Sequence, residues 1–313
     1  MPEDPLHCHP RDIAAFALRH IDKGTALVFV TATEGGSVRA PGLRMAVRAD
    51  GATIGFMSNG CVEADVAAVA VEAIREQRFT ETAYGRGSGK IDIVLPCGGR
   101  VDVAIVPVTA QNSAGVAAMI ASGRHSGTLA VGADGGLGWN HPDDGPWEAK
   151  YRFAIHPKIR LVVAGAGTEA LIVCRLAAFA DMEVEIISPD RTTLASAAAL
   201  GIRARELRGL ASQVVVDADA FTAVALLFHD HEWEALVLVE ALKGPAFYVG
   251  ALGSRRAHAK RLEKLSEMGC DDLELARIKA PIGLIHQLRE PNLLAASVLA
   301  EIAGVFSALY ISF

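Results

Sequence analysis

Short apolar runs and longer amphipathic segments alternate along the second half of the chain. Each run of β-branched and aliphatic residues is followed by a segment whose apolar positions recur at helical spacing. This alternation is typical of a parallel sheet covered by helices, so we predict an α/β Rossmann-type parallel sheet domain over residues 158–313. The predicted strands cover residues 160–164, 184–187, 224–228 and 246–250. The predicted helices cover residues 169–180, 192–200, 233–242, 254–268 and 292–309.

The first half mixes strands and helices in a different order, which predicts an N-terminal α+β domain over residues 1–110. Asp50 and Gly51 separate two strand-like runs and predict a β-hairpin. The predicted helices are 11–21 and 62–78, and the predicted strands are 26–31, 43–48, 53–57, 90–95 and 101–106. Residues 111–157 are less regular, and 132–146 are rich in Gly, Pro and Asp, so this part is predicted to be an irregular connecting region.

Composition narrows the class of protein. A chain of 313 residues with 51% hydrophobic residues has room for two domains with real cores. A formal net charge of -6 disfavours a nucleic-acid binder. We also expect no apolar run long enough to span a bilayer, and the polar first ten residues lack the order of a signal peptide. The resulting expectations are a cytoplasmic protein with no membrane or nucleic-acid partner.

Residues 165–170 form a G-x-G-x-x-A pattern between a predicted strand and a predicted helix. Gly165 permits the tight turn, and Gly167 lets a phosphate approach the backbone. The helix that opens at Thr168 then offers free N–H groups and a partial positive charge to an anion. Asp190 follows the next strand, where an acid often binds a ribose hydroxyl. The alternative is a Rossmann-like loop that binds nothing.

Two further loops follow strands of the same predicted sheet. His229 and Asp230 come directly after residues 224–228, where His229 is a candidate to hydrogen-bond a ligand or act as acid or base. The alternative is a helix cap by Asp230 beside a solvated histidine.

The second of these loops precedes the predicted helix 254–268. Gly253 permits close backbone approach, Ser254 is a candidate cap, and Arg255 and Arg256 supply groups that match phosphate. The pattern predicts a second anion-binding loop, and the alternative is a capped helix with a solvated basic first turn.

Cysteines lie in two glycine-containing loops of the first half. Cys61 begins the predicted helix 62–78, where the helix N-terminus favours the thiolate. Cys97 precedes Gly98 and Gly99, and a nearby arginine adds positive charge. Each thiol is a candidate ligand for a metal or sulfur centre, and the alternative is a small buried hydrophobe. These two cysteines form no C-x-x-C pair, so structural zinc is not expected.

Several sequence blocks carry a family resemblance along nearly the whole chain. The chain resembles the XdhC/CoxI family of xanthine dehydrogenase accessory factors. The blocks are residues 36–42 with Met45, residues 60–66, residues 97–99, the pattern at 165–170, residues 246–256 with His258, and residues 281–284.

The resemblance implies a chaperone that binds molybdenum cofactor (molybdopterin) and aids its sulfuration and insertion, rather than a turnover enzyme. The implied partners are a molybdenum hydroxylase of xanthine dehydrogenase type and a cysteine desulfurase, with a homo-oligomer left open. Cys61, Glu63, Cys97, Gly98 and Gly99 would then belong to the cofactor site, with the two thiols as candidate molybdenum contacts.

An NAD(P)-dependent oxidoreductase is the alternative function, because the glycine pattern and Asp190 suit a dinucleotide equally well. Such an enzyme needs a positioned proton donor, and the candidates are His229 and Tyr248. A protein that binds a ligand without catalysing a reaction is a third alternative, and it overlaps with the chaperone function.

Overall fold

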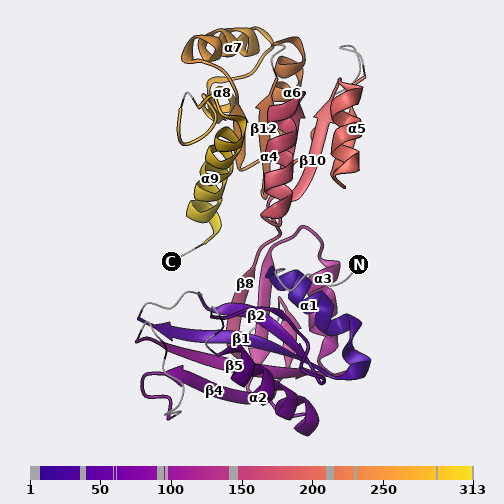
Figure 1. Ribbon diagram of the computed structural model, residues 1–313, viewed down its shortest axis with the longest axis vertical. Coiled ribbons are helices and arrows are strands. Elements are labelled where there is room, and N and C mark those ends of the chain that lie inside the picture. Colours follow the sequence, from indigo (N-terminus) through magenta and orange to yellow (C-terminus); the bar gives the residue numbers. More distant parts are fainter. Residues whose placement is uncertain are drawn as a thin grey trace. The chain divides into compact units, whose positions relative to one another are not determined.

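The computed structural model describes two compact units, Met1–Pro157 and Lys158–Phe313 (Figure 1). The described residues are 8–35, 40–58, 60, 62–89, 95, 98–140, 147–208, 215–228, 231–286 and 288–311.

The second unit contains the predicted Rossmann-type parallel sheet. Its described strands are ordered β11-β10-β9-β12-β13-β14, and every neighbouring pair is parallel. The strands are β9 (Arg160–Gly165), β10 (Glu183–Ser188), β11 (Arg203–Glu206), β12 (Thr222–Leu227), β13 (Tyr248–Ala251) and β14 (Ile278–Lys279). The sequence pattern did not predict β11 and β14, because the first is charged, the second is short, and both lie at edges where polar residues are tolerated.

Helices cover both faces of this sheet. On one face, Leu161 and Val163 pack with α4 (Thr168–Phe179), α5 (Arg191–Ala199) and α9 (Pro291–Tyr310), which Figure 1 shows in the upper part of the view. On the other face, Val162 and Ala164 pack with α6 (His231–Lys243), α7 (Arg255–Glu267) and α8 (Asp272–Ala276). Successive residues of β9 therefore face opposite cores, which explains why its sequence is apolar throughout.

Helix α9 corrects one expectation from the sequence. It has 20 residues and a mean hydropathy of 1.8, so by length and composition alone it could cross a membrane. In the structure, its apolar side chains Leu294, Val298 and Ile302 are buried in the core shared with α4. Glu301 on the same helix accepts hydrogen bonds from within the unit. These contacts attach one side of the helix to the Rossmann unit, and 39% of the apolar window is buried.

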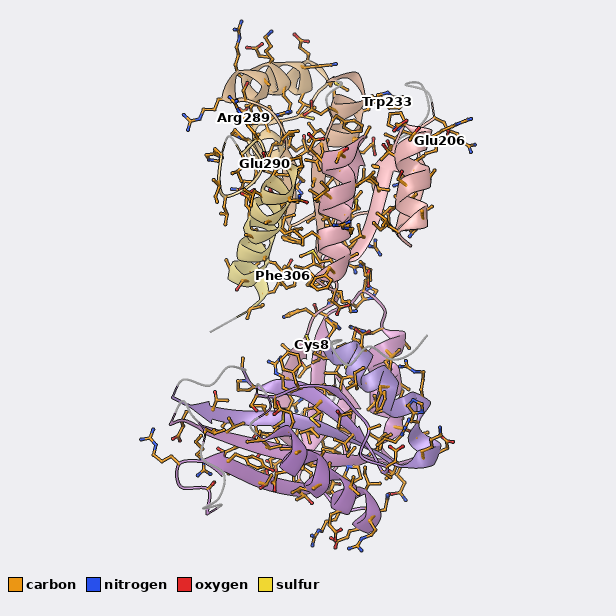
Figure 2. The ribbon with its side chains drawn as sticks, viewed as in Figure 1. Cys8, Glu206, Trp233, Arg289, Glu290 and Phe306 are labelled. Atoms are coloured by element: carbon orange, nitrogen blue, oxygen red, sulfur yellow. The ribbon has the colours of Figure 1, made fainter. Side chains whose placement is uncertain are left out.

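Aromatic rings fix the end of α9. Phe306, labelled in Figure 2, and Tyr310 form a cluster with Phe221 and Phe247. The Tyr310 hydroxyl also donates a hydrogen bond of 2.6 Å to the carbonyl of Ala220. The last turns of α9 are therefore attached to the segments that enter β12 and β13.

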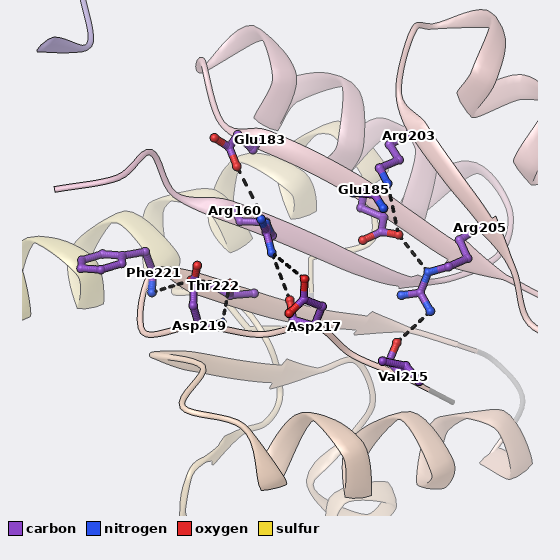
Figure 3. Close-up of polar contacts among 10 residues, drawn as sticks. All are labelled: Arg160, Glu183, Glu185, Arg203, Arg205, Val215, Asp217, Asp219, Phe221 and Thr222. Atoms are coloured by element: carbon purple, nitrogen blue, oxygen red, sulfur yellow. Dashed lines mark hydrogen bonds and ion pairs between the residues drawn. The ribbon is translucent and has the colours of Figure 1, made fainter. Parts of the chain in front are cut away.

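Ion pairs tie the first strands of the sheet together (Figure 3). Arg160 on β9 lies 3.8 Å from Glu183 on β10 and 3.5 Å from Asp217. Glu185 is buried and pairs with Arg205 on β11 at 2.9 Å. Arg205 also donates to the carbonyl of Val215 at 2.7 Å, which connects the edge strand to the chain that leads into β12.

The first unit contains an antiparallel sheet with the strand order β3-β2-β1-β5-β4 among the described residues. Its strands are β1 (Thr25–Glu34), β2 (Gly42–Arg48), β3 (Thr53–Gly55), β4 (Thr80–Gly85) and β5 (Arg100–Val108). The predicted hairpin is β2–β3, and Gly51 adopts a φ of 85° in its turn. The sequence analysis did not predict β4. The predicted strand 90–95 lies outside the described residues except for Leu95.

Two cores lie on opposite faces of this sheet. Helix α1 (Pro10–Arg19) contributes Ile13 and Phe16 to one core, which also holds Phe29 of β1. Helix α2 (Glu63–Glu76) contributes Val66 and Ala70 to the other. The α+β character predicted for this half is therefore present.

Residues 111–157 differ from the predicted irregular connection. They contain α3 (Ser113–Ala121), β6 (Gly127–Gly132), β7 (Leu137–Trp139) and β8 (Ala149–Ile155), with the strands ordered β7-β6-β8. Phe153 of β8 stacks on Phe29 of β1 at 5.3 Å, so this segment completes the first unit. Glycines made these strands hard to predict from the sequence. Gly127 begins β6, and glycine is needed there because a β-carbon would stand only 2.1 Å from the ring of Trp139.

Core packing in the second unit predicts a clear stability difference. Ile186 on β10 is fully buried, whereas Leu273 on α8 is 81% exposed. We expect Ile186→Ala to lower the free energy of unfolding by about 2–5 kcal/mol, because it leaves a cavity in the sheet core. Leu273→Ala is the control and should change it by less than about 0.5 kcal/mol. Urea denaturation of both variants measures the difference, and equal midpoints would contradict this core assignment.

Candidate functional site

The two glycines of the first loop have different roles in the structure. At Gly165, a β-carbon would stand 2.5 Å from the carbonyl oxygen of Leu227, so glycine is required for β9 and β12 to approach at their ends. At Gly167, φ is 84° and no described atom lies within 4 Å of where a β-carbon would be. Gly167 is also the N-cap of α4, and it has no side chain that could accept a hydrogen bond from the helix N–H groups. Gly165 therefore serves packing, and Gly167 leaves the exposed helix start at Thr168 open to a ligand.

Asp190 is the cap of α5. Its Oδ2 accepts hydrogen bonds from the Thr193 backbone N–H at 2.9 Å and from the Thr193 hydroxyl at 2.5 Å. The Thr193 Oγ1 in turn accepts from the backbone N–H of Gly167 at 2.9 Å. The hydrogen bonds from Thr193 lower the pKa of Asp190 below its usual value. The acid predicted for a ribose hydroxyl is thus engaged in holding α5 and the first glycine loop together.

The second glycine loop begins α7. Gly253 has a φ of 131°, and the Ser254 hydroxyl oxygen accepts a hydrogen bond from the backbone N–H of Ala257 at 3.2 Å. Arg255 and Arg256 occupy the exposed first turn and make no ion pair or hydrogen bond with a described residue. Cations at a helix N-terminus oppose the helix dipole, so this turn gains most from a bound anion.

The strand order brings both glycine loops to one edge. They follow β9 and β13, which both neighbour β12, so at about 4.8 Å per strand spacing the loops flank the end of β12 at about 10 Å from each other. The chain also reverses direction across the sheet between β9 and β12, which is where open α/β sheets bind ligands. His229 and Asp230 follow β12 directly, but they lie outside the described residues.

A buried ion pair beside this edge was missed by the sequence analysis. Arg261 of α7 donates to Glu234 of α6 at 2.5 Å, and both side chains are at least 95% buried. Arg261 also donates to the carbonyl of Leu252 at 2.6 Å, next to Gly253. Arg261 stands one helical turn before Leu265, which belongs to the core. A charged residue on the core-facing side of a helix is therefore the sequence signal for this ion pair.

Tyr248 is not available as a proton donor at this edge. Its ring is buried in the core, and its hydroxyl donates a short hydrogen bond to Glu301 of α9. The backbone N–H of Gly283 donates to the same carboxylate oxygen at 2.8 Å. Burial and the Glu301 carboxylate both raise the pKa of Tyr248 well above its usual value. The proton-donor prediction for Tyr248 is wrong. Side chains alternate between the two faces of a strand, and the Tyr248 side chain lies on the face that packs against α9.

Glu63 clamps the loop that carries Cys61. Its carboxylate accepts hydrogen bonds from the backbone N–H groups of Met57 at 3.1 Å and Ser58 at 2.5 Å, and from the Ser58 hydroxyl at 2.7 Å. Val62 N–H donates to it at 3.2 Å. Burial disfavours the charged form, but these hydrogen bonds prevail and lower the pKa of Glu63. The carboxylate is therefore occupied by its own loop.

The turn after Cys97 is held by close backbone contacts. Gly98 has a φ of 66° and is exposed, and its N–H donates to the carbonyl of Leu95 at 2.8 Å. Gly99 is buried against β4: a β-carbon on Gly85 would lie 2.1 Å from its carbonyl oxygen. Glycine at both positions of this contact fixes the path of the turn.

Described residues near the two cysteines in the sequence belong to one hydrophobic cluster. Met57 and Val62, which flank Cys61 in sequence, pack in the same cluster as Leu95, which precedes Cys97. Tyr84 of β4 lies in this cluster too, and its hydroxyl donates to Asp65 of α2 at 2.7 Å. Cys61 and Cys97 themselves lie outside the described residues. The described residues near them, Met57, Val62 and Leu95, belong to the same core of the first unit.

The described cysteines differ in accessibility. Cys174 on α4 is fully buried, and this burial raises the pKa of its thiol to about 12. Cys8 and Cys270 are partly exposed. In the part of the chain that the structure describes, no three His, Cys, Asp or Glu side chains gather as a metal site.

Comparison with known proteins gives consistent matches along the chain. Residues 161–302 match the XdhC Rossmann domain, and residues 19–85 match the XdhC and CoxI family. The molybdenum cofactor insertion chaperone PaoD of Escherichia coli is 34% identical over 94% of this chain and 88% of its own. An uncharacterized Escherichia coli protein, YqeB, is 24% identical over 86% of this chain and 41% of its own length.

A solved structure shares the fold. A xanthine dehydrogenase from Bacillus halodurans superimposes with a TM-score of 0.76 over 97% of both chains, at 18% identity. At this level of identity the likeness concerns the fold alone.

The open backbone at Gly167 predicts a specific effect on ligand binding. We expect Gly167→Val to weaken binding of nucleotides and of pterin cofactor at least about tenfold, because the side chain would stand where phosphate meets backbone. Gly201→Val is the matched control, since Gly201 also has a positive φ (73°) and open space but lies at the end of α5. Calorimetric titration compares the variants, and equal affinities would show that the loop is structural.

The Glu63 clamp predicts a pH-dependent contribution to stability. Because its folded pKa is depressed, the clamp should stabilise the protein above the unfolded pKa of about 4.3 and be lost as pH falls through the lower folded value. We expect Glu63→Gln to lower the free energy of unfolding by about 1–2 kcal/mol at pH 7 and by progressively less in acid. Glu72→Gln, on the exposed side of α2, is the control. Denaturant unfolding between pH 3 and pH 7 tests this, and a difference that does not shrink in acid would exclude the clamp.

Proposed function

Because this chain belongs to the XdhC and CoxI family, we propose that it binds molybdenum cofactor and delivers it to a molybdenum enzyme as an accessory chaperone. The observation that carries the proposal is the 34% identity to a molybdenum cofactor insertion chaperone over nearly the whole of both chains. The cofactor is here the cargo of the protein, and each unit by itself carries groups that suit one part of the cofactor's chemistry.

The second unit offers the groups that suit the phosphate end of the cofactor. The N-terminus of α4 is open at Gly167, and backbone N–H groups at a helix start favour an anion. Arg255 and Arg256 occupy a helix start where positive charge is unfavourable without a partner anion. We assign both glycine loops to the phosphate, and we keep His229 and Asp230 as candidate ligand contacts on the strength of the sequence.

The first unit offers the groups that suit the molybdenum and sulfur end. Thiolates are the protein ligands that best match a soft, sulfur-rich centre, and Cys61 and Cys97 are the candidates. Gly60 has a φ of 92°, and no described atom lies within 4 Å of where a β-carbon would stand on Gly60 or on Gly98. We assign Glu63 to positioning the Cys61 loop, since its carboxylate already accepts several hydrogen bonds from that loop.

The finer part of the proposal concerns the partners. A cysteine desulfurase would supply sulfur to the bound cofactor, and a hydroxylase of xanthine dehydrogenase type would receive it. We place this transfer in the cytoplasm.

An NAD(P)-dependent oxidoreductase is the weaker candidate. The parallel sheet and the first glycine loop suit a dinucleotide. However, Asp190 is engaged as a helix cap, and Tyr248 is buried against Glu301, so the acid and one of two proposed proton donors have other roles.

The thiol assignment predicts a selective loss of cargo. Protein purified from a molybdenum-replete host should retain cofactor, detected by mass spectrometry and ultraviolet absorbance. We expect Cys61→Ala, and to a lesser degree Cys97→Ala, to lose cofactor and to fail in activating the partner hydroxylase. Cys174→Ala is the control, because that thiol lies in the core.

Alkylation at neutral pH provides an independent measurement. Cys61 should react faster than Cys174, whose raised pKa leaves it almost entirely protonated, and cofactor should protect Cys61. Unchanged cofactor retention and partner activation in Cys61→Ala would overturn the thiol role and favour a plain nucleotide-binding module.

A further inference from the structure

The buried ion pair between α6 and α7 lies next to the second glycine loop. Arg261 of α7 is 7% exposed and Glu234 of α6 is 4% exposed. Taking two charges out of water is costly, and two apolar side chains of similar volume often give the same stability or more. Stability alone therefore does not account for these two residues, and the cost points to a role in fixing geometry.

Arg261 holds the backbone where the second glycine loop begins. Its Nη2 donates a hydrogen bond of 2.6 Å to the carbonyl of Leu252. A β-carbon on Gly253 would lie 3.3 Å from the same nitrogen, so glycine lets the guanidinium approach the loop closely. The backbone N–H of Leu252 donates to the carbonyl of Leu226 on β12 at 2.9 Å. The peptide groups on the two sides of Leu252 are thus held, one by β12 and the other by Arg261.

Glu234 orients the guanidinium for this contact. It accepts a hydrogen bond of 2.5 Å from Nε of Arg261, and Nη1 lies 3.3 Å from Nδ1 of His258, one turn earlier on α7. Each nitrogen of the guanidinium therefore has a partner within the unit, and three partners define the orientation of a planar group. Glu234 lies in the first turn of α6, so this orientation also depends on where α6 begins.

The pair adds no net charge beside the loop. The charges of Arg261 and Glu234 cancel, so neither residue is assigned to binding the anion itself. That assignment belongs to the backbone N–H groups at the start of α7 and to Arg255 and Arg256 in its exposed first turn. The direction of these groups depends on the path of the chain through Gly253, where φ is 131°.

We propose that Arg261 is the positioning residue of the second glycine loop and that Glu234 holds it in this role. The hydrogen bond to Leu252 fixes the path of the loop into α7 before a ligand arrives, so binding an anion requires little further ordering of the backbone. This role rests on the assignment of the loop to the phosphate end of the cofactor. It makes the affinity of the loop depend on two buried residues that do not touch the ligand.

A double variant tests the positioning role without leaving a buried charge unpaired. Arg261→Met/Glu234→Gln removes both charges and the hydrogen bond to Leu252, and the side-chain volumes stay similar. The probe is inorganic phosphate, titrated into the full chain at constant ionic strength while NMR follows the Gly253 and Ser254 amide signals. We expect saturable shifts in the wild type and at least about tenfold weaker binding in the double variant, because the loop must then be ordered on binding.

Another ion pair of the same unit provides the matched control. Glu185 is buried and pairs with Arg205, and Arg205 also donates to a backbone carbonyl, that of Val215. This pair lies between β10 and β11, on the other side of β9 from the second glycine loop. Arg205→Met/Glu185→Gln should bind phosphate at Gly253 like the wild type. Urea denaturation of both double variants compares their stability, so a loss of affinity confined to the first is not an effect of destabilisation.

Three outcomes would overturn the positioning role. Wild-type affinity in Arg261→Met/Glu234→Gln would do so and leave the phosphate assignment of the loop intact. Equal weakening in both double variants would show a general effect of lost stability. Absence of any shift of Gly253 and Ser254 in the wild type would refute the phosphate assignment of this loop, and the positioning role with it.

Discussion

The close approach of β9 and β12 at Gly165 is the constraint on which the second unit depends. The absent side chain of Gly165 lets the end of β9 lie against the Leu227 peptide, and any β-carbon would collide with that carbonyl. This contact occurs where the strand order reverses, so it fixes which loops share the carboxyl edge. The open turn at Gly167, the start of α6 and the second glycine loop all take their positions from these two strands and their neighbour β13.

Carboxylates near the candidate sites are engaged by the protein itself. Asp190 caps α5, Glu63 holds its loop, Glu234 pairs with Arg261, and Glu301 binds Tyr248 and the Gly283 backbone. Buried or partly buried acids need such donors, because an unpaired carboxylate is costly to desolvate. Arg255 and Arg256 at the start of α7 are exposed and make no such contact with a described residue. The chain is acidic as a whole, with a net charge of -6, yet this edge of the sheet is suited to anions.

The sequence predicts what local periodicity determines, and the structure adds what depends on distant partners. Most strands and helices from β9 to α9 follow from alternating apolar runs, and the parallel sheet is confirmed. The edge strand β11 is charged, and β6 begins at Gly127, near Trp139, and ends at Gly132, near Trp147, so neither has a strong pattern. The capping role of Asp190 and the clamp by Glu63 depend on side-chain geometry that spacing does not specify. Cys61, Cys97, His229 and Asp230 lie outside the described residues, and their roles stay predictions.

The two units differ in the kind of ligand group that they suit, and this difference separates the candidate functions. A dinucleotide has phosphates and rings but no soft centre, so it would leave the paired cysteine loops of the first unit without a role. A pterin cofactor with a phosphate tail and a sulfur-ligated metal has a chemical match in each unit. Met57, Val62 and Leu95, which lie near the two cysteines in the sequence, belong to one hydrophobic cluster. The similarity to a molybdenum cofactor insertion chaperone therefore favours the proposed molybdenum cofactor over a dinucleotide.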